Sequence, residues 1–181
     1  MAADPDQVLV QAMARGDTRA LDELYNRYGQ RLLAYLVGLL DNRQVAEEVL
    51  QDVMLAAWRG AAGFRGESRV TTWLLGIARL QALSARRRRY PVVMPLNENA
   101  ANDDTGEFRR VEQEGDRAAV RAALRELPSD QRETLELIFY HELTGTEAAA
   151  LLGVPEGTVK SRLNRAKTSL RRLLRWKESG L

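Results

Sequence analysis

The chain has 181 residues, 45% of them apolar, and no cysteine, so it can bury one or two small cores but no disulfide or thiolate metal site. A single histidine, an acidic start and no apolar stretch longer than residues 32–40 lead us to expect a cytoplasmic protein without a metal, cofactor, secretory signal or membrane insertion. The net charge of +2 conceals two basic ends, residues 1–90 and 121–181 at +3 each, around residues 91–120 at −4.

The first half of the chain shows helical periodicity. Asp17 is placed as a helix N-cap, and apolar residues then recur at spacings of three and four up to Leu39. Asp41 and Asn42 end that helix, and a second one presents an apolar face made of Val45, Val49, Val53 and Ala56. Ser68 is expected to cap a third helix, whose core-facing residues would be Trp73, Leu74, Ile77, Leu80 and Leu83.

The periodicity stops at Pro91 and returns near Glu114. The stretch between them is polar, acidic and rich in Asn and Asp, which predicts an extended linker, disordered in the free protein. A helix then ends at Pro128, Ser129 is expected to cap the next helix, and His141 is expected at the surface or at a helix end. The sequence therefore predicts an all-α protein with domains over residues 1–90 and 115–181, joined by a linker over residues 91–114.

A helix-turn-helix pattern follows in the second half. Thr144 and Glu147 have the spacing of a capping box, and Gly153 is placed to end a short helix in the left-handed conformation. Pro155 fits the first turn of a second helix. A short helix, a tight glycine turn and a longer helix are the layout by which many proteins enter the major groove of DNA.

The faces of the second helix support DNA binding. One stripe is apolar and consists of Val159, Leu163, Ala166, Leu170 and Leu173. The other side carries the candidate DNA-binding residues Thr158, Lys160, Ser161, Arg162, Asn164 and Arg165. An ordinary amphipathic helix would also have a charged outer face, but eight basic residues from Lys160 to Lys177 favour a nucleic acid as partner.

Residues 127–174, with the run Gly153 to Lys167 at their centre, resemble region four of the extracytoplasmic-function (ECF) sigma factors. In that family this domain holds the minus-thirty-five promoter element and packs on the flap of RNA polymerase. Regulators with a LuxR-type helix-turn-helix have a similar motif. The sequence departs from the family pattern at Ala148, where a branched apolar residue is commoner.

Residues 42–54 are similar to the family's region-two helix, which docks on the polymerase clamp. The resemblance implies that Glu47, Glu48, Gln51 and Asp52 bind polymerase. Glu47, Glu48 and Gln51 share a face opposite the three valines, as docking requires. A solvated helix face is the alternative. Neither a histidine nor a metal motif accompanies these carboxylates, so we expect no catalytic residue.

Residues 64–79 resemble the segment that opens and reads the minus-ten element. Opening DNA requires cations for the backbone and a surface for an unstacked base. The candidate cations are Arg65, Arg69, Arg79, Arg86 and Arg87. Trp73 is expected in the core because it shares a helical register with other apolar residues. The sequence departs from the family pattern at Val70, Leu80 and Ser84, so the promoter preference cannot be transferred from relatives.

The two resemblances occur in the family's order and cover nearly the whole chain. They imply a sigma factor, without enzymatic activity, whose partners are core RNA polymerase, promoter DNA and an anti-sigma factor. An autonomous helix-turn-helix regulator would explain only the second half. A DNA-processing enzyme would need a reactive Ser or Tyr or an acidic metal cluster, and we find none in the sequence.

Overall fold

The computed structural model describes residues 6–89 and 114–178, and within these ranges every regular element is a helix. The predicted all-α class is therefore confirmed. The chain divides into two compact units, and the expected linker lies largely outside the described residues. None of the helices in the described ranges combines the length and apolarity that a membrane crossing requires.

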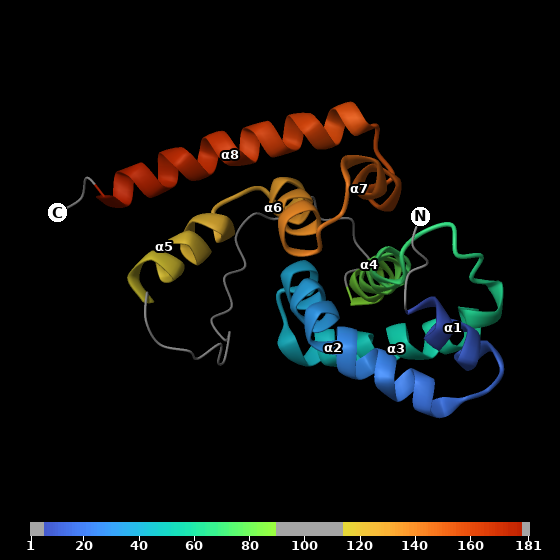
Figure 1. Ribbon diagram of the computed structural model, residues 1–181. Coiled ribbons are helices and arrows are strands. Elements are labelled where there is room, and N and C mark those ends of the chain that lie inside the picture. The colour runs from blue at the N-terminus through green and yellow to red at the C-terminus, as the bar shows by residue number, and fades with distance from the viewer. Residues whose placement is uncertain (1–5, 90–113, 179–181) are drawn as a thin grey trace. The chain divides into compact units, whose positions relative to one another are not determined.

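The first unit consists of four α-helices and one short 3₁₀ turn, which are α1 (Gln7–Ala14), α2 (Thr18–Leu40), α3 (Arg43–Gly60), the turn Ala61–Gly63 and α4 (Val70–Arg89). Helices α2, α3 and α4 pack against one another, and α1 lies along α2 and the 3₁₀ turn (Figure 1). Fully buried side chains at their centre include Leu24, Tyr35, Leu36, Val53, Leu74 and Leu75.

Local signals start and end the helices of this unit. The Asp17 carboxylate accepts a hydrogen bond from the backbone N–H of Arg19 at 3.0 Å, so the predicted N-cap is confirmed. Asp41 ends α2 in the left-handed conformation, and the Asn42 side chain then caps α3 through the N–H of Val45. The prediction for Ser68 is wrong, because α4 begins at Val70 and the carbonyl of Arg69 accepts its first hydrogen bond.

The buried face of α4 matches the predicted one only in part: Leu74 is buried as expected, and Ile77 and Leu83 are half-buried. Its buried residues are Val70, Leu74, Leu75, Ala78, Ala82 and Ala85. Leu80, expected in the core, is 68% exposed, and Trp73 is only half-buried. The first turns of α4 bury large side chains, whereas its second half buries alanines, which a search for large apolar residues does not mark.

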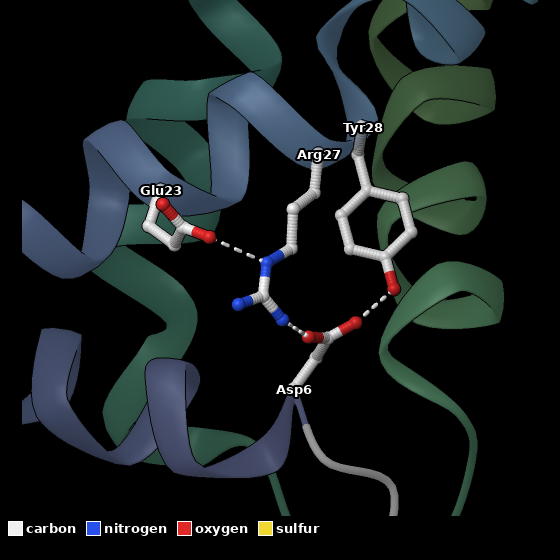
Figure 2. Close-up of polar contacts among 4 residues, drawn as sticks. All are labelled: Asp6, Glu23, Arg27 and Tyr28. Carbon is white, nitrogen blue, oxygen red and sulfur yellow. Dashed lines mark hydrogen bonds and ion pairs between the residues drawn. The ribbon is translucent and has the colours of Figure 1, made fainter.

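Helix α1 is fastened to α2 by a polar network at its first residues (Figure 2). The Asp6 carboxylate, 8% exposed, accepts hydrogen bonds from the Arg27 guanidinium and the Tyr28 hydroxyl. Arg27 also binds Glu23 within α2 at 2.7 Å. Hydrogen bonds to Glu23 and Asp6 raise the pKa of Arg27 above its usual value, and the guanidinium gives the buried Asp6 carboxylate a counter-charge.

The second unit consists of α5 (Glu114–Arg125), α6 (Ser129–Leu135), a π-helical turn Glu136–Tyr140, α7 (Gly145–Leu152) and α8 (Glu156–Glu178). Helix α8 packs against α5, α6 and α7. Part of the core is formed by Leu127, Leu135 and Ala166, with Leu124, Leu163 and Leu170 packed around them. The prediction for Ser129 is wrong: it is the first residue of α6, and the carbonyl of Pro128 accepts the opening hydrogen bonds.

His141 lies at a helix end, as expected, but it is not at the surface. It ends the π-helical turn and is only 2% exposed. Its Nε2 lies 3.9 Å from a carboxylate oxygen of Glu136, and its ring meets that of Tyr140 edge-on at 5.0 Å. The next residue, Glu142, has a positive φ of 57°, and buried Leu143 then donates its N–H to the carbonyl of Leu137 at 3.0 Å.

Candidate nucleic-acid interface

The turn between α7 and α8 has the predicted helix-turn-helix chemistry. The Thr144 hydroxyl accepts from the N–H of Glu147 at 3.2 Å, and the Glu147 carboxylate accepts from the N–H of Thr144 at 2.8 Å. This reciprocal pair is the predicted capping box. Gly153 ends α7 in the left-handed conformation at φ +68°, also as predicted. Pro155 differs slightly: it precedes α8, and its carbonyl accepts from Thr158 and Val159.

Helix α8 separates apolar from polar residues as the sequence indicates. Val159 and Ala166 are buried, while Leu163, Leu170 and Leu173 are half-buried beneath the helix. On the opposite side, Lys160, Asn164 and Arg165 are exposed. One helix therefore offers two cations and an amide to solvent next to a fixed turn, which is what a helix in a major groove presents to DNA.

The remaining residues of that set are placed differently. Thr158 and Ser161 are half-buried, and the Ser161 hydroxyl donates to the carbonyl of Thr158 at 3.0 Å. The Arg162 side chain is only 22% exposed, and its Nε lies 3.1 Å from Oδ2 of Asp130 on α6. This ion pair joins α8 to the neighbouring helix, and no sequence pattern indicated it because Asp130 belongs to another helix.

A further cation of α8 lies beside an aromatic side chain. Lys167 Nζ is 5.3 Å from the centroid of the Phe139 ring, in cation–π geometry. Phe139 is 59% exposed, so the pair is at the surface of the second unit. Lys167 stands seven residues beyond Lys160, which on a helix places it about two turns further along.

The acidic face of α3 is exposed as expected. Glu47, Glu48, Gln51 and Asp52 all lie at the surface, opposite the buried valines of the same helix. Two of the carboxylates have partners: Arg43 Nε lies 3.0 Å from Glu47, and Arg88 lies 4.0 Å from Asp52. Leu55, 46% exposed, adds an apolar side chain to this face. The four predicted residues thus form one continuous face with an apolar end.

The loop between α3 and α4 contains an aromatic pair. The rings of Phe64 and Trp73 are 4.9 Å apart and tilted by 42°. Together with Arg65, Glu67 and Ser68 they line a hollow of about 220 Å³. Trp73 is therefore neither a core residue nor a fully exposed one. No spacing in the sequence indicates the contact between these two rings.

The five candidate cations of the first unit are not equally accessible. Arg65, Arg69 and Arg87 are exposed, while Arg79 and Arg86 are half-buried along α4. Arg65 is 80% exposed on its side chain and lies 3.7 Å from Glu67. The cations run from the loop along α4 to its basic end, so they can follow a nucleic-acid backbone rather than enclose a small ligand.

Both units match models of one protein family. Residues 24–91 match region 2 of the sigma-70 family, and residues 117–170 match its region 4. The RNA polymerase sigma-H factor of Pseudomonas aeruginosa is 31% identical, with 96% of each chain covered. The ECF RNA polymerase sigma factor SigM of Mycobacterium tuberculosis is 35% identical over 97% of this chain and 88% of the relative.

Solved structures of sigma factors are also similar to this chain. CnrH, solved in complex with the cytosolic domain of CnrY, is similar with a TM-score of 0.66 and 26% identity over 93% of this chain and 96% of CnrH. The sigma factor RpoE of Bartonella quintana, solved with the anti-sigma factor NepR, is similar with the same score and identity over 85% of this chain. The chain belongs to the extracytoplasmic-function family of RNA polymerase sigma factors.

Proposed function

We propose that this protein binds core RNA polymerase in the cytoplasm, directs it to promoters and helps to open the DNA, without catalysing a reaction itself. The observation that carries the proposal is one chain that combines an exposed acidic face on α3 with a helix-turn-helix. Each lies within a region that a sigma-family model matches. An autonomous helix-turn-helix regulator would not require the acidic face on α3.

The second unit is proposed to bind the minus-thirty-five element through α8. Lys160 is assigned to a phosphate, because an exposed ammonium is a point charge without directional preference. Arg165 is assigned to a base edge, with Thr158, Ser161 and Asn164 allowing close approach. Arg162 is also proposed to contact the DNA. Its guanidinium is already paired with Asp130, so we expect its contact to be weaker than that of Arg165.

The first unit is proposed to bind the minus-ten region. The aromatic hollow at Phe64 and Trp73 offers a stacking surface for a base that has left the duplex. The cations Arg65, Arg69, Arg79, Arg86 and Arg87 would follow the backbone of the opened strand. The acidic face of α3, with Glu47, Glu48, Gln51 and Asp52, is proposed to bind the polymerase clamp.

An anti-sigma factor is proposed as a third partner. RpoE of Bartonella quintana is bound to one in its solved structure, and this chain shares its fold. A chain without cysteine has no thiol switch of its own, so control by a second protein is a consistent solution. Co-purification from the native host should recover a partner that covers the polymerase-binding surfaces under non-inducing conditions. Recovery of free, active protein under those conditions would contradict this assignment.

The polymerase assignment is tested by reversing charge on α3. Glu48→Lys with Asp52→Lys should weaken binding to core polymerase by at least about tenfold, because the charge of the proposed docking face would be reversed. Runoff transcription should fall in proportion, while circular dichroism shows an intact fold. Glu48→Lys is also measured alone and compared with Asp22→Lys, which reverses another exposed carboxylate, on α2. Unchanged affinity in a folded double variant would remove α3 from the interface.

A further inference from the structure

Helix α1 lies outside the residues that match region 2, yet it packs against the loop that carries the aromatic hollow. Gln7 lies directly beside Gly66: a Cβ at Gly66 would come 3.3 Å from the Gln7 side-chain nitrogen. A second hollow, of about 310 Å³, is lined from one side by Gln7, Gln11 and Arg15 and from the other by Phe64 and Arg65. The position of α1 therefore limits the positions that the loop can take.

The position of α1 depends in turn on Asp6. Both carboxylate oxygens are used, one by Arg27 and the other by Tyr28, and both partners belong to α2 (Figure 2). The backbone carbonyl of Asp6 accepts from the N–H groups of Leu9 and Val10 at 3.0 and 3.2 Å. One residue thus begins α1 and also fastens it to the long helix behind it.

We infer that Asp6 is a positioning residue for promoter opening. It fixes the position of α1, and α1 in turn limits the conformations of residues 61–69. The inference rests on the proposed function of the loop. To bind DNA, the loop must hold its aromatic and cationic side chains in one arrangement. If α1 holds the loop in that arrangement before DNA binds, the entropy cost of ordering the loop does not weaken binding. The network at Asp6 fixes the arrangement of the loop although Asp6 does not line the hollow.

The test compares Asp6→Asn with Glu23→Gln in the full-length protein assembled with core polymerase. Both variants remove a carboxylate that binds Arg27, but Glu23 lies on the same helix as Arg27, so only Asp6→Asn releases α1. We expect Asp6→Asn to slow open-complex formation by about tenfold, within the range for coupled contacting side chains. Affinity for core polymerase should not change. Glu23→Gln should behave as wild type, and Asp6→Glu, which keeps the charge, should retain most of the rate.

Hydrogen exchange on the same variants gives a second readout. Asp6→Asn should raise exchange in residues 61–69 while leaving α3 protected. Wild-type opening by a folded Asp6→Asn protein would overturn the inference. It is also overturned if exchange rises throughout the first unit and polymerase affinity falls together with opening, because Asp6 would then only stabilise the fold. Failure of the wild-type holoenzyme to open any promoter would instead refute the proposed function, and this inference with it.

Discussion

The turn before α8 in the second unit and the loop before α4 in the first unit are held by contacts of different range along the chain. In the second unit, the turn that leads into α8 depends on residues close to it in the chain: Thr144 and Glu147 cap α7, and Gly153 ends α7 three residues before α8 begins. The ion pair between Asp130 and Arg162 adds one contact of longer range. In the first unit, the loop with Phe64 is supported by α1, which Asp6 fastens to Arg27 across 21 residues. The position of α8 is therefore set mainly by the chemistry of the turn before it, whereas the position of the loop in the first unit is set by the packing of separate helices.

This difference predicts different modes of failure. A helix-turn-helix keeps its local geometry as long as its small core holds α8 in place. The loop of the first unit can lose its shape although the core of α2, α3 and α4 stays folded, because α1 is a short peripheral helix with its own attachment. In the second unit, we therefore expect a substitution that destabilises the core to abolish DNA binding as well. In the first unit, a substitution at α1 should impair DNA binding without unfolding the core.

The largest effect is expected for Val159→Asp. Val159 is 1% exposed in the core of the second unit, and a carboxylate there would have no counter-charge. The free energy of unfolding of this unit should fall by about 4 kcal/mol or more, enough to unfold a small domain. Hydrogen exchange resolved by segment should show α5–α8 exposed while α2–α4 stay protected, since the first unit has its own core.

Val120→Asp is the matched control. It introduces the same side chain on α5, where Val120 is 40% exposed, and should change stability by less than about 0.5 kcal/mol. Simultaneous loss of protection in the first unit of Val159→Asp would show that the two units fold as one, and the comparison between them would fail.

The next largest effects concern α8 on DNA. Arg165→Ala should cost about 1–3 kcal/mol on the preferred promoter and relax the preference at one base position. Lys160→Ala should weaken all promoters alike and lower the salt slope by about one unit. Arg162→Ala should cost less sequence preference than Arg165→Ala, because Asp130 already engages its guanidinium.

Titrations of the protein with promoter fragments over a salt series measure these three variants. Asn164→Ala serves as a control on the same face that removes no charge. If Arg162→Ala and Arg165→Ala both keep the affinity and the sequence preference of the wild type, α8 does not read the promoter.

The sequence predicted those features whose causes lie close together in the chain. The Asp17 cap, the capping box, the left-handed Gly153 and the apolar stripe of α8 each depend on spacings of a few residues, and each is confirmed. The acidic face of α3 was also predictable, because its buried side was marked by three valines. Helical periodicity and turn chemistry are sufficient for such features.

The features that escaped prediction have causes on another helix. The large apolar residues of α4 suggested a core face that includes Leu80, whereas the buried face continues from Leu74 and Leu75 through Ala78, Ala82 and Ala85. The pairs Asp130–Arg162 and Phe64–Trp73 join segments whose separation in the sequence follows no period. No spacing in the sequence marked His141 as a buried residue at the end of the π-helical turn. Propensity and pattern carry no information on such partners.

The smallest effects should come from two glycines, one in each unit, that share a left-handed conformation but differ in their surroundings. A Cβ at Gly153 would meet no atom within 4 Å, so Gly153→Ala should cost only the backbone term, about 1 kcal/mol. A Cβ at Gly66 would in addition meet the Gln7 side chain of α1 at 3.3 Å. Gly66→Ala should therefore cost somewhat more, and Gln7→Ala should recover the excess in a double-mutant cycle measured by thermal unfolding. Gly153→Ala should show no such coupling to Gln7, because its cost is local. If Gly66→Ala and Gln7→Ala prove strictly additive, α1 does not constrain the loop, and the loop of the first unit would then be set by local geometry alone.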